Sequence, residues 1–493
     1  MADWDVKDLE YWDEKIREKV EEFGLSCYPQ EFEICDHSQM LGYMAYSGMP
    51  SHYPHWSYGK SYEKLKTMYD YGVSGLPYEM VINSSPALAY LMRDNTLCLQ
   101  ILTTAHVYGH NDFFKNNFTF KSTRAEDTIS IFKIHADRVR GYMEDPSIGI
   151  EKVESIMDVA HALSLQCRRN LAIKKLTRNE EEQALLDAAE PLTDEFGKVH
   201  KRQEYVKPDL TKVPLSPEED ILLFIRDHNP YLSEWEKDLL TIAHQESQYF
   251  IPQIETKIMN EGWASFWHRE ILNSLKLPQE LHLEFLVHHN QVVRPFPGGL
   301  NPYFLGLTVW DATRLIYGGT PRHAEEEELI RSLQEENECN TFFPNDSATR
   351  KWQDKIFMVR EVDRDISFLR QYLTEPLMRR MDMFQYGPKG EELVISQVSD
   401  RAGWREVKET LLKNVGMGSI PVIKIEDADY GHNRVLYLKH YHEGRDLQLE
   451  YGEKTLKYLR QLWGHEVILE TVVGGKKVLL LYNEKGFNTK PIK

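Results

Sequence analysis

The sequence predicts a mainly α protein: a large helical N-terminal domain with aromatic-rich loops, residues 1–387, followed by a small α+β C-terminal domain, residues 388–493. Three observations support this prediction. A chain of 493 residues is too long for one compact core. Helix-capping residues and helical apolar spacing recur up to about residue 382. After residue 388 they give way to short β-branched or alternating runs.

The first part of the chain is predicted to be helical with irregular connections. An opening helix at 4–24 ends at Gly24, and the Pro-, Gly- and aromatic-rich segment 47–63 cannot form one regular helix. Extended chain is predicted from Asn83, with a helix that begins near Ser85 and Pro86. Two further helices are predicted at 125–144 and 150–170.

The middle of the chain combines a charged insertion with well-marked helices. Residues 170–216 are charged, and the second half of this segment has few large apolar side chains, which is typical of a solvated insertion. Hydroxyl caps followed by Glu three residues later, together with first-turn prolines, mark the helices that follow. These are predicted at 217–228, 234–249, 252–274, 279–291, 302–317, 321–336 and 353–382.

The C-terminal domain is predicted to be one sheet with two helices on a face. Its helices are expected at about 402–414 and 452–462. Its strands are expected at 393–396, 421–425, 435–438, 467–469 and 478–481. The region lacks a cluster of catalytic side chains, and short strands leave edges to which a partner strand can add. We therefore expect it to fold separately and to serve recognition.

Composition and charge exclude several classes of protein. The net charge of −18 repels nucleic acid and anionic lipid, and no basic tract interleaved with aromatics offsets it. No apolar run approaches the roughly 20 residues of a membrane span. The acidic start lacks the features of a signal peptide, and the five scattered cysteines indicate reduced thiols. These features predict a cytoplasmic protein without a membrane span or nucleic-acid partner.

Two segments carry residues that suit a metal site. His106 and His110 lie four residues apart, on one face of a helix, and Glu261 and His268 lie two turns apart on another. Imidazoles and carboxylates at such spacings bind zinc, iron or manganese. The alternative is a pair of buried histidines that hydrogen-bond within an aromatic core.

The histidine pair resembles half of a zinc-peptidase motif. In that motif a Glu follows the first histidine and acts as general base, whereas this chain has Val107. Asn260–Ala264 resembles the NEGxA segment that supplies the third zinc ligand in gluzincin peptidases. Without the base, orthodox peptide hydrolysis is not expected. Asp112 is a candidate substitute, although it follows His110 and faces another direction.

A second histidine–carboxylate pair widens the candidate set. Glu154 and His161 are also seven residues apart and would join the other residues in a helical-core metal centre. The alternative is a solvated acidic stripe, and the Glu-x-x-His ligand motif of such centres is absent. His288 and His289 have no partner motif and are interpreted as structural. The chain has no GxGxxG after a strand, no P-loop and no GxSxG, so nucleotide chemistry and serine hydrolysis are not supported.

Three sequence motifs closely resemble those of the SpoVR family, the stage V sporulation protein R proteins. In chain order they are HVYGHNDFFKNN (106–117), MNEGWASFWH (259–268) and the Pro/Gly-rich segment 294–306. The resemblance covers essentially the whole chain. It implies a cytoplasmic bacterial protein associated with spore cortex formation, in the mother-cell cytoplasm of a spore-former. Relatives in non-sporulating bacteria accompany a PrkA-type serine kinase and a further protein.

The resemblance supplies a process but no reaction, so two function classes stay open. One is a metal-dependent enzyme that acts on a peptidoglycan-related or other cell-envelope-related substrate. Its centre would contain His106, His110 and Glu261, with His268 as a fourth ligand and with Glu261 or Asp112 in catalysis. The other is a non-catalytic sporulation factor that acts through protein partners. The histidine and Glu261 motifs favour the enzyme, whereas the missing base at Val107 and the absence of a cofactor motif favour the non-catalytic factor.

Overall fold

The computed structural model describes residues 4–73, 75–169, 175–189, 208–295, 299–336, 352–383, 385–389, 392–397 and 401–492. The chain forms two compact units. The first is Met1–Arg138 with Gln248–Ser419, and the second is Val139–Ser247 with Ile420–Lys493. Position 388 lies inside the first unit, and the separate folding of residues 388–493 stays a prediction.

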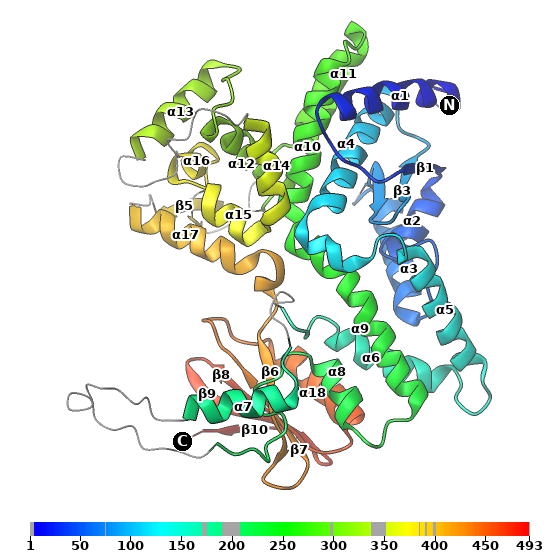
Figure 1. Ribbon diagram of the computed structural model, residues 1–493, viewed down its shortest axis with the longest axis vertical. Helices are drawn as coiled ribbons and strands as arrows, with labels where there is room; N and C mark the ends of the chain where they lie inside the picture. Colours follow the sequence, from blue (N-terminus) through cyan, green and yellow to red (C-terminus); the bar gives the residue numbers. More distant parts are fainter. Residues whose placement is uncertain are drawn as a thin grey trace. The chain divides into compact units, whose positions relative to one another are not determined.

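The first unit is mainly helical, with a three-stranded sheet near its N-terminus (Figure 1). Its elements before the second unit are α1 (Val6–Glu22), β1 (Gln30–Cys35), α2 (His37–Ala45), α3 (Trp56–Asp70), β2 (Glu79–Ile82), β3 (Ala87–Met92), α4 (Leu97–Asn116), η1 (Phe118–Thr123) and the start of α5 (Thr128–Glu144). The later ones are the end of α9 (Glu234–Glu255), α10 (Lys257–Ser274), α11 (Gln279–Val292), α12 (Pro302–Ile316), α13 (Ala324–Glu336), α14 (Trp352–Val362), α15 (Asp365–Tyr372), α16 (Glu375–Arg380), β4 (Gln385–Lys389), β5 (Glu392–Gln397), α17 (Arg401–Asn414) and η3 (Gly416–Ser419).

The small sheet has the strand order β1-β3-β2, with β3 parallel to β1 and antiparallel to β2. The prediction of a helix from Ser85 and Pro86 is wrong, because Ala87–Met92 is strand β3 and α4 begins only at Leu97. Five of the six residues of β3 are buried. A continuous apolar run of this length fits a buried strand and a buried helix equally well, so the period alone could not separate them.

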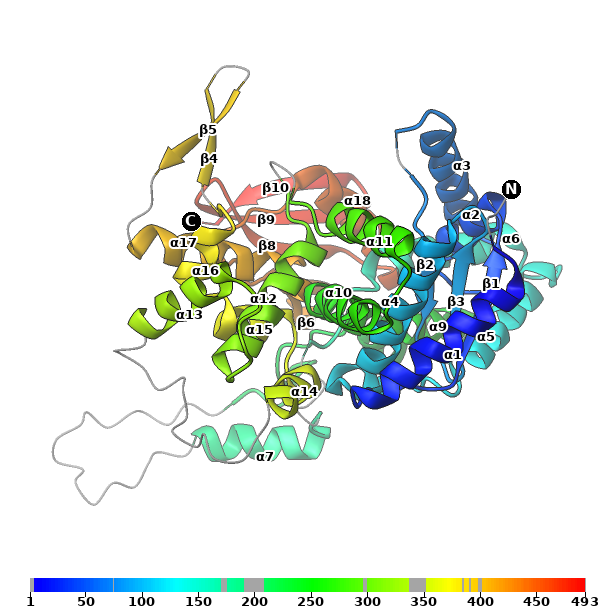
Figure 2. The ribbon, with the colours of Figure 1, turned by 90° about the horizontal axis from the view of Figure 1, so that it is seen from above.

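Helix α10 lies between α4 and α12 (Figures 1 and 2). Glycines permit the close approach on both sides. A Cβ added to Gly109 of α4 would meet the Cα of Ala264 at 2.6 Å. A Cβ added to Gly262 of α10 would meet the carbonyl carbon of Gly306 of α12 at 2.3 Å. Trp263, Trp267 and other aromatics of α10 fill the core around these contacts.

Two predicted helix boundaries in this unit are wrong. α9 runs through Pro252 to Glu255, so α10 begins at Lys257 rather than at the proline. The helix predicted at 353–382 is three short helices, α14, α15 and α16. The chain turns extended at Arg364 and Thr374, which precede α15 and α16. Apolar spacing continues across these turns because all three helices face the same core.

The second unit contains a five-stranded sheet. Its elements are the end of α5, α6 (Ile150–Leu163), α7 (Arg178–Ala189), α8 (Ile221–His228), the start of α9, β6 (Ile423–Tyr430), β7 (Val435–His440), α18 (Leu449–Trp463), β8 (Val467–Val473), β9 (Lys476–Asn483) and β10 (Gly486–Pro491). The strand order is β10-β9-β8-β7-β6, with β7 and β8 parallel. Helix α18 connects β7 to β8 and packs on β8, β9 and α6.

The mainly α class with a C-terminal α+β sheet is confirmed, but the sheet differs from its prediction in three respects. The strand predicted at 393–396 is β5, which pairs with β4 in a separate two-stranded sheet of the first unit. The predicted pair of helices on one face is wrong, because α17 belongs to the first unit and packs near α15 and α16. β10 was not predicted. Glu218 forms a bridge to Ile425 of β6, so a segment far earlier in the chain covers part of that strand.

Of the predicted charged insertion, residues 170–174 and 190–207 lie outside the described part of the chain. Between them, α7 has no buried residue, as expected of a solvated segment. None of the described helices combines the length and the apolarity needed to cross a bilayer.

Candidate metal centre

Helix α4 presents the two histidines from within the core. Thr96 caps the helix, since its hydroxyl accepts the N–H of Leu99 at 3.3 Å. All residues from Cys98 to Phe114 are buried, so this helix is covered on every side. His106 and His110 lie one turn apart, and their ring centroids are 4.6 Å apart.

Helix α10 presents the glutamate. The carboxylate of Asp365 accepts the N–H groups of Ile258 and Met259, both at 2.9 Å, and so satisfies two orphan donors of the first turn. Glu261 follows within one turn and directly precedes Gly262, the residue at the tight contact with α12. The two glycine contacts of α10 therefore fix Glu261 relative to the histidines of α4.

The three side chains converge on one point. Oε2 of Glu261 lies 3.4 Å from Nε2 of His110 and 3.8 Å from Nε2 of His106. All three ligand atoms lie within 4.8 Å of one another. Donors 2.0–2.1 Å from a tetrahedral ion are about 3.3 Å apart. Nε2 of His106 and Oε2 of Glu261 are buried without a hydrogen-bond partner. This group could hold a metal ion.

His268, expected as a fourth ligand, lies behind His106 instead. Nδ1 of His106 is 2.8 Å from Nδ1 of His268, and Nε2 of His268 is 2.7 Å from Nδ1 of His289. If Nδ1–H of His106 donates to His268, then His268 donates in turn to His289, and the free Nε2 lone pair of His106 faces Glu261. A metal-binding histidine commonly donates its other ring N–H to such a partner.

His110 is oriented in the same way by a different residue. Its Nδ1 lies 2.8 Å from Oδ1 of Asn260, the residue before Glu261. A ring that donates from Nδ1 keeps its Nε2 lone pair directed at the Glu261 carboxylate. Two neighbouring residues of α10 thus hold both sides of this ring.

The protonation states of Glu261 and His106 suit cation binding, whereas His110, whose pKa is raised, would have to release its proton to a cation. Burial lowers the pKa of His106 to about 4 and that of His289 to about 4, and it holds the pKa of His268 well below its usual range. Burial acts to raise the pKa of Glu261, but the two histidines outweigh it and leave that pKa lowered. Burial acts to lower the pKa of His110, but Glu261 outweighs it and leaves that pKa raised. An ionised carboxylate beside imidazoles is what a divalent cation requires.

A pocket of about 390 Å³ opens onto His110 and Glu261 of this group. The pocket lies within the first unit and combines polar and apolar side chains. Its lining residues are Glu79, Met80, Val81, His110, Phe114, Phe250, Gln253, Ile254, Lys257, Asn260, Glu261 and Tyr303. The charge of Glu261, together with burial, raises the pKa of the Tyr303 phenol and keeps it protonated.

Asp112, a candidate catalytic residue, is engaged elsewhere. It is fully buried, and both of its oxygens lie 2.7 Å from Nη1 of Arg360. It also accepts the backbone N–H of Ser26 and the indole N–H of Trp263. Val107, at the position of the missing base, packs with apolar residues of the small sheet. Both side chains serve the packing of α4.

Glu154 and His161 lie on α6 in the second unit. Within the described ranges, no group of three ligand residues that includes either of them reaches metal-binding spacing. The structure therefore brings together His106, His110 and Glu261 from the expected set.

Sequence reasoning missed four residues around this centre. His289 was interpreted as structural, yet it ends the hydrogen-bonded chain from His106. Asn260 orients His110, Tyr303 lies at Glu261, and Glu79 of β2 comes within 4.0 Å of His106. One sequence signal for close helix packing was available. A glycine lies near each of His110, Glu261 and Tyr303, and an isolated glycine within a helix often marks close packing.

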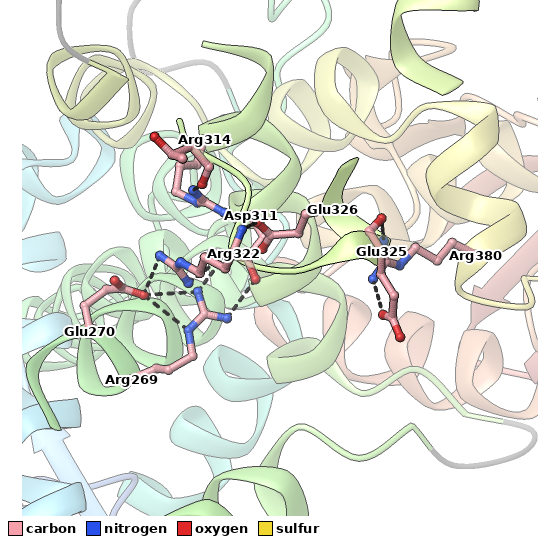
Figure 3. Close-up of polar contacts among 9 residues, drawn as sticks. Arg269, Glu270, Asp311, Arg314, Arg322, Glu325, Glu326 and Arg380 are labelled. Atoms are coloured by element: carbon pink, nitrogen blue, oxygen red, sulfur yellow. Dashed lines mark hydrogen bonds and ion pairs between the residues drawn. The ribbon is translucent and has the colours of Figure 1, made fainter. Parts of the chain in front are cut away.

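Charged residues fasten α10 to α12 two turns beyond Glu261 (Figure 3). The guanidinium of Arg269 forms two hydrogen bonds to the carboxylate of Asp311, at 2.8 and 2.6 Å. Arg322 lies 2.8 Å from Glu270, and Arg314 pairs with Glu326 at 2.6 Å. This network adds directional contacts to the glycine packing that positions α10.

The comparisons with known proteins match nearly the whole chain. The family model described as SpoVR like protein matches residues 3–420, and the SpoVR-like C-terminal domain matches residues 421–474. The "Uncharacterized protein YcgB" of Escherichia coli (strain K12) is 32% identical over 489 residues, which cover 95% of this chain and 92% of that protein. No solved structure matches the chain. The chain belongs to the SpoVR-like family.

Proposed function

We propose that this protein is a metal-dependent enzyme whose ion is bound by His106, His110 and Glu261. The observation that carries the proposal is the convergence of these side chains, with a buried imidazole nitrogen and a carboxylate oxygen left without partners, at the wall of a pocket. A bound zinc, iron or manganese ion supplies Lewis acidity there. The pocket of about 390 Å³ suits a small substrate or a single group of a larger one.

The reaction we propose is not that of an HExxH peptidase. Position 107 carries a buried valine, and Asp112 is bound by Arg360, so neither supplies a general base at the ion. A substrate would instead meet Lys257, Asn260 and Tyr303 in the pocket wall. These residues offer a cation, an amide and a phenol for binding and orientation.

The biological process we propose follows from the family. SpoVR proteins are associated with spore cortex formation, which suggests a peptidoglycan-related or other cell-envelope-related substrate. The enzyme would act in the cytoplasm, that of the mother cell in a spore-former. A PrkA-type serine kinase and its accompanying protein are the partners that the family suggests.

The test of metal binding is elemental analysis of protein purified without chelator. We expect about one ion per chain in the unmodified protein and a loss of it in His110→Ala. His323→Ala, which removes an exposed histidine of the same unit, serves as the matched control. Protein without metal in every preparation would refute the proposal.

The second candidate function is a non-catalytic factor that acts through partner proteins, and Val107 at the place of the base favours it. Glu261→Gln separates the two, since it keeps the shape and removes the charge. An enzyme requires this carboxylate, so we expect the variant to fail in cortex assembly at normal protein levels. Unimpaired assembly would favour the non-catalytic factor.

A further inference from the structure

A second carboxylate faces the proposed ion from the small sheet. In the antiparallel pair of β2 with β3, Glu79 lies opposite Leu91 and Val81 lies opposite Ala89. Side chains two residues apart on a strand share a face. Val81 packs against the apolar cluster that contains Val107 of α4. Glu79 therefore lies on the face of the sheet that is turned toward α4.

Glu79 approaches His106 about as closely as Glu261 does. Its Oε1 lies 4.0 Å from Nε2 of His106, whereas Oε2 of Glu261 lies 3.8 Å from the same nitrogen. Both carboxylates line the same pocket, and the side chain of Glu79 is 15% exposed. The two glutamates thus approach His106 at similar distances from two different elements, a strand and a helix.

Without a cation, this arrangement is electrostatically unfavourable. Two buried carboxylates repel each other unless a positive charge compensates them. A divalent ion between them would supply that charge.

We propose that Glu79 is a fourth protein ligand, so that two imidazoles and two carboxylates bind one iron(II) or manganese(II) ion. This inference rests on the metal centre proposed above and extends it to a second carboxylate and to the identity of the ion. Carboxylate-rich sets suit harder, octahedral ions, whereas four protein ligands would close a tetrahedral zinc site. An octahedral ion keeps two positions for a molecule in the pocket, which opens onto His110 and both glutamates.

The test is a titration of chelator-stripped protein with Mn²⁺, in which the free ion is measured by its electron paramagnetic resonance signal. Glu79→Gln keeps the shape of the side chain and removes its charge. Loss of a partner outside the ligand set costs about 10–100-fold in affinity. We expect a loss of more than about 100-fold for Glu79→Gln, and a smaller loss would overturn the assignment.

Glu33→Gln is the matched control, because Glu33 lies in the same sheet, on β1, and its carboxylate accepts the hydroxyl proton of Tyr43. We expect its Mn²⁺ affinity to equal that of the unmodified protein. Glu79→Asp is a second variant, which keeps the negative charge but shortens the side chain by one methylene. It should also weaken Mn²⁺ binding. Equal affinity in Glu79→Asp and in the unmodified protein would contradict a directly bound carboxylate.

Cobalt(II) loading provides an independent readout of coordination number. We expect the weak visible absorption of six-coordinate cobalt in the unmodified protein, and an intense tetrahedral spectrum would overturn the proposed open positions. These variants distinguish failure of the proposed metal centre from failure of the proposed role of Glu79. If His110→Ala abolishes metal binding and Glu79→Gln leaves it intact, the centre stands and only the role of Glu79 is refuted.

Discussion

Gly109→Ala tests whether close packing of α4 on α10 builds the metal centre. The added Cβ would lie 2.6 Å from Cα of Ala264, and ordinary contact begins at 3.4 Å, so the two helices would have to separate by about 0.8 Å. Alanine by itself favours a helix by about 1 kcal/mol over glycine. Overpacking costs about 1–3 kcal/mol or more, and the neighbour here is backbone that cannot rotate away. We therefore expect a net destabilisation of up to about 2 kcal/mol.

The same displacement should weaken metal binding, because ligand distances tolerate only about 0.2 Å. Gly59→Ala is the matched control: it lies in α3 of the same unit, and its added Cβ would meet nothing within 4 Å. Its stability should be unchanged or higher, with unaltered metal affinity. Urea denaturation and metal titration of both variants give the comparison. A Gly109→Ala protein as stable as Gly59→Ala, with full metal affinity, would refute the packing argument.

Three further predictions concern the residues that support the centre. His268→Leu should lower metal affinity by about 10–100-fold, because His106 loses its orienting partner. His268→Asn keeps a hydrogen-bond acceptor and should lose less affinity. Equal affinities of the two variants in a metal titration would contradict this prediction. Arg360→Met leaves the charge of the buried Asp112 uncompensated and should destabilise the protein by about 3–5 kcal/mol. Urea denaturation followed by tryptophan fluorescence measures this. A loss of stability below about 1 kcal/mol would argue against a stabilising ion pair between Arg360 and Asp112. Burial acts to raise the pKa of Asp311, but Arg269 outweighs it and leaves that pKa lowered, so its contribution is present above about pH 4 and is lost as the pH falls further. Asp311→Asn should accordingly cost about 2 kcal/mol at pH 7 and progressively less below pH 4, and a pH-independent cost would exclude the ion pair as its source.

The fold class was predictable because the hydrophobic period changes along the chain, and α18 and four of the five strands of the second sheet lie close to their predicted positions. Pairings between distant segments were not predictable. β3 is a buried apolar run that fits helix or strand, and α6 and α8 join the second unit through contacts that leave no local pattern. The separate folding of residues 388–493 still has to be tested by expressing that fragment.

The candidate centre was also predictable only in part. Helical spacing placed His106 and His110 together, and a family-like string pointed to Glu261. Spacing cannot show which ring nitrogens are already bound, so it could not distinguish His268 behind His106 from a ligand. Glu79 comes from a strand whose pairing with β3 depends on tertiary structure, and no sequence pattern marked it.

The division of the centre between two distant segments has a consequence for protein synthesis. His110 and its partner Asn260 are 150 residues apart, and the intervening chain includes Val139–Ser247, which belongs to the other unit. At roughly 5–20 residues per second, the ribosome delivers the second half roughly 8–30 s after the first. During that interval the histidines have emerged without their carboxylate. The proposed centre is therefore complete only after translation of α10, and until then α4, which is buried on every side in the folded protein, lacks the helix that covers it.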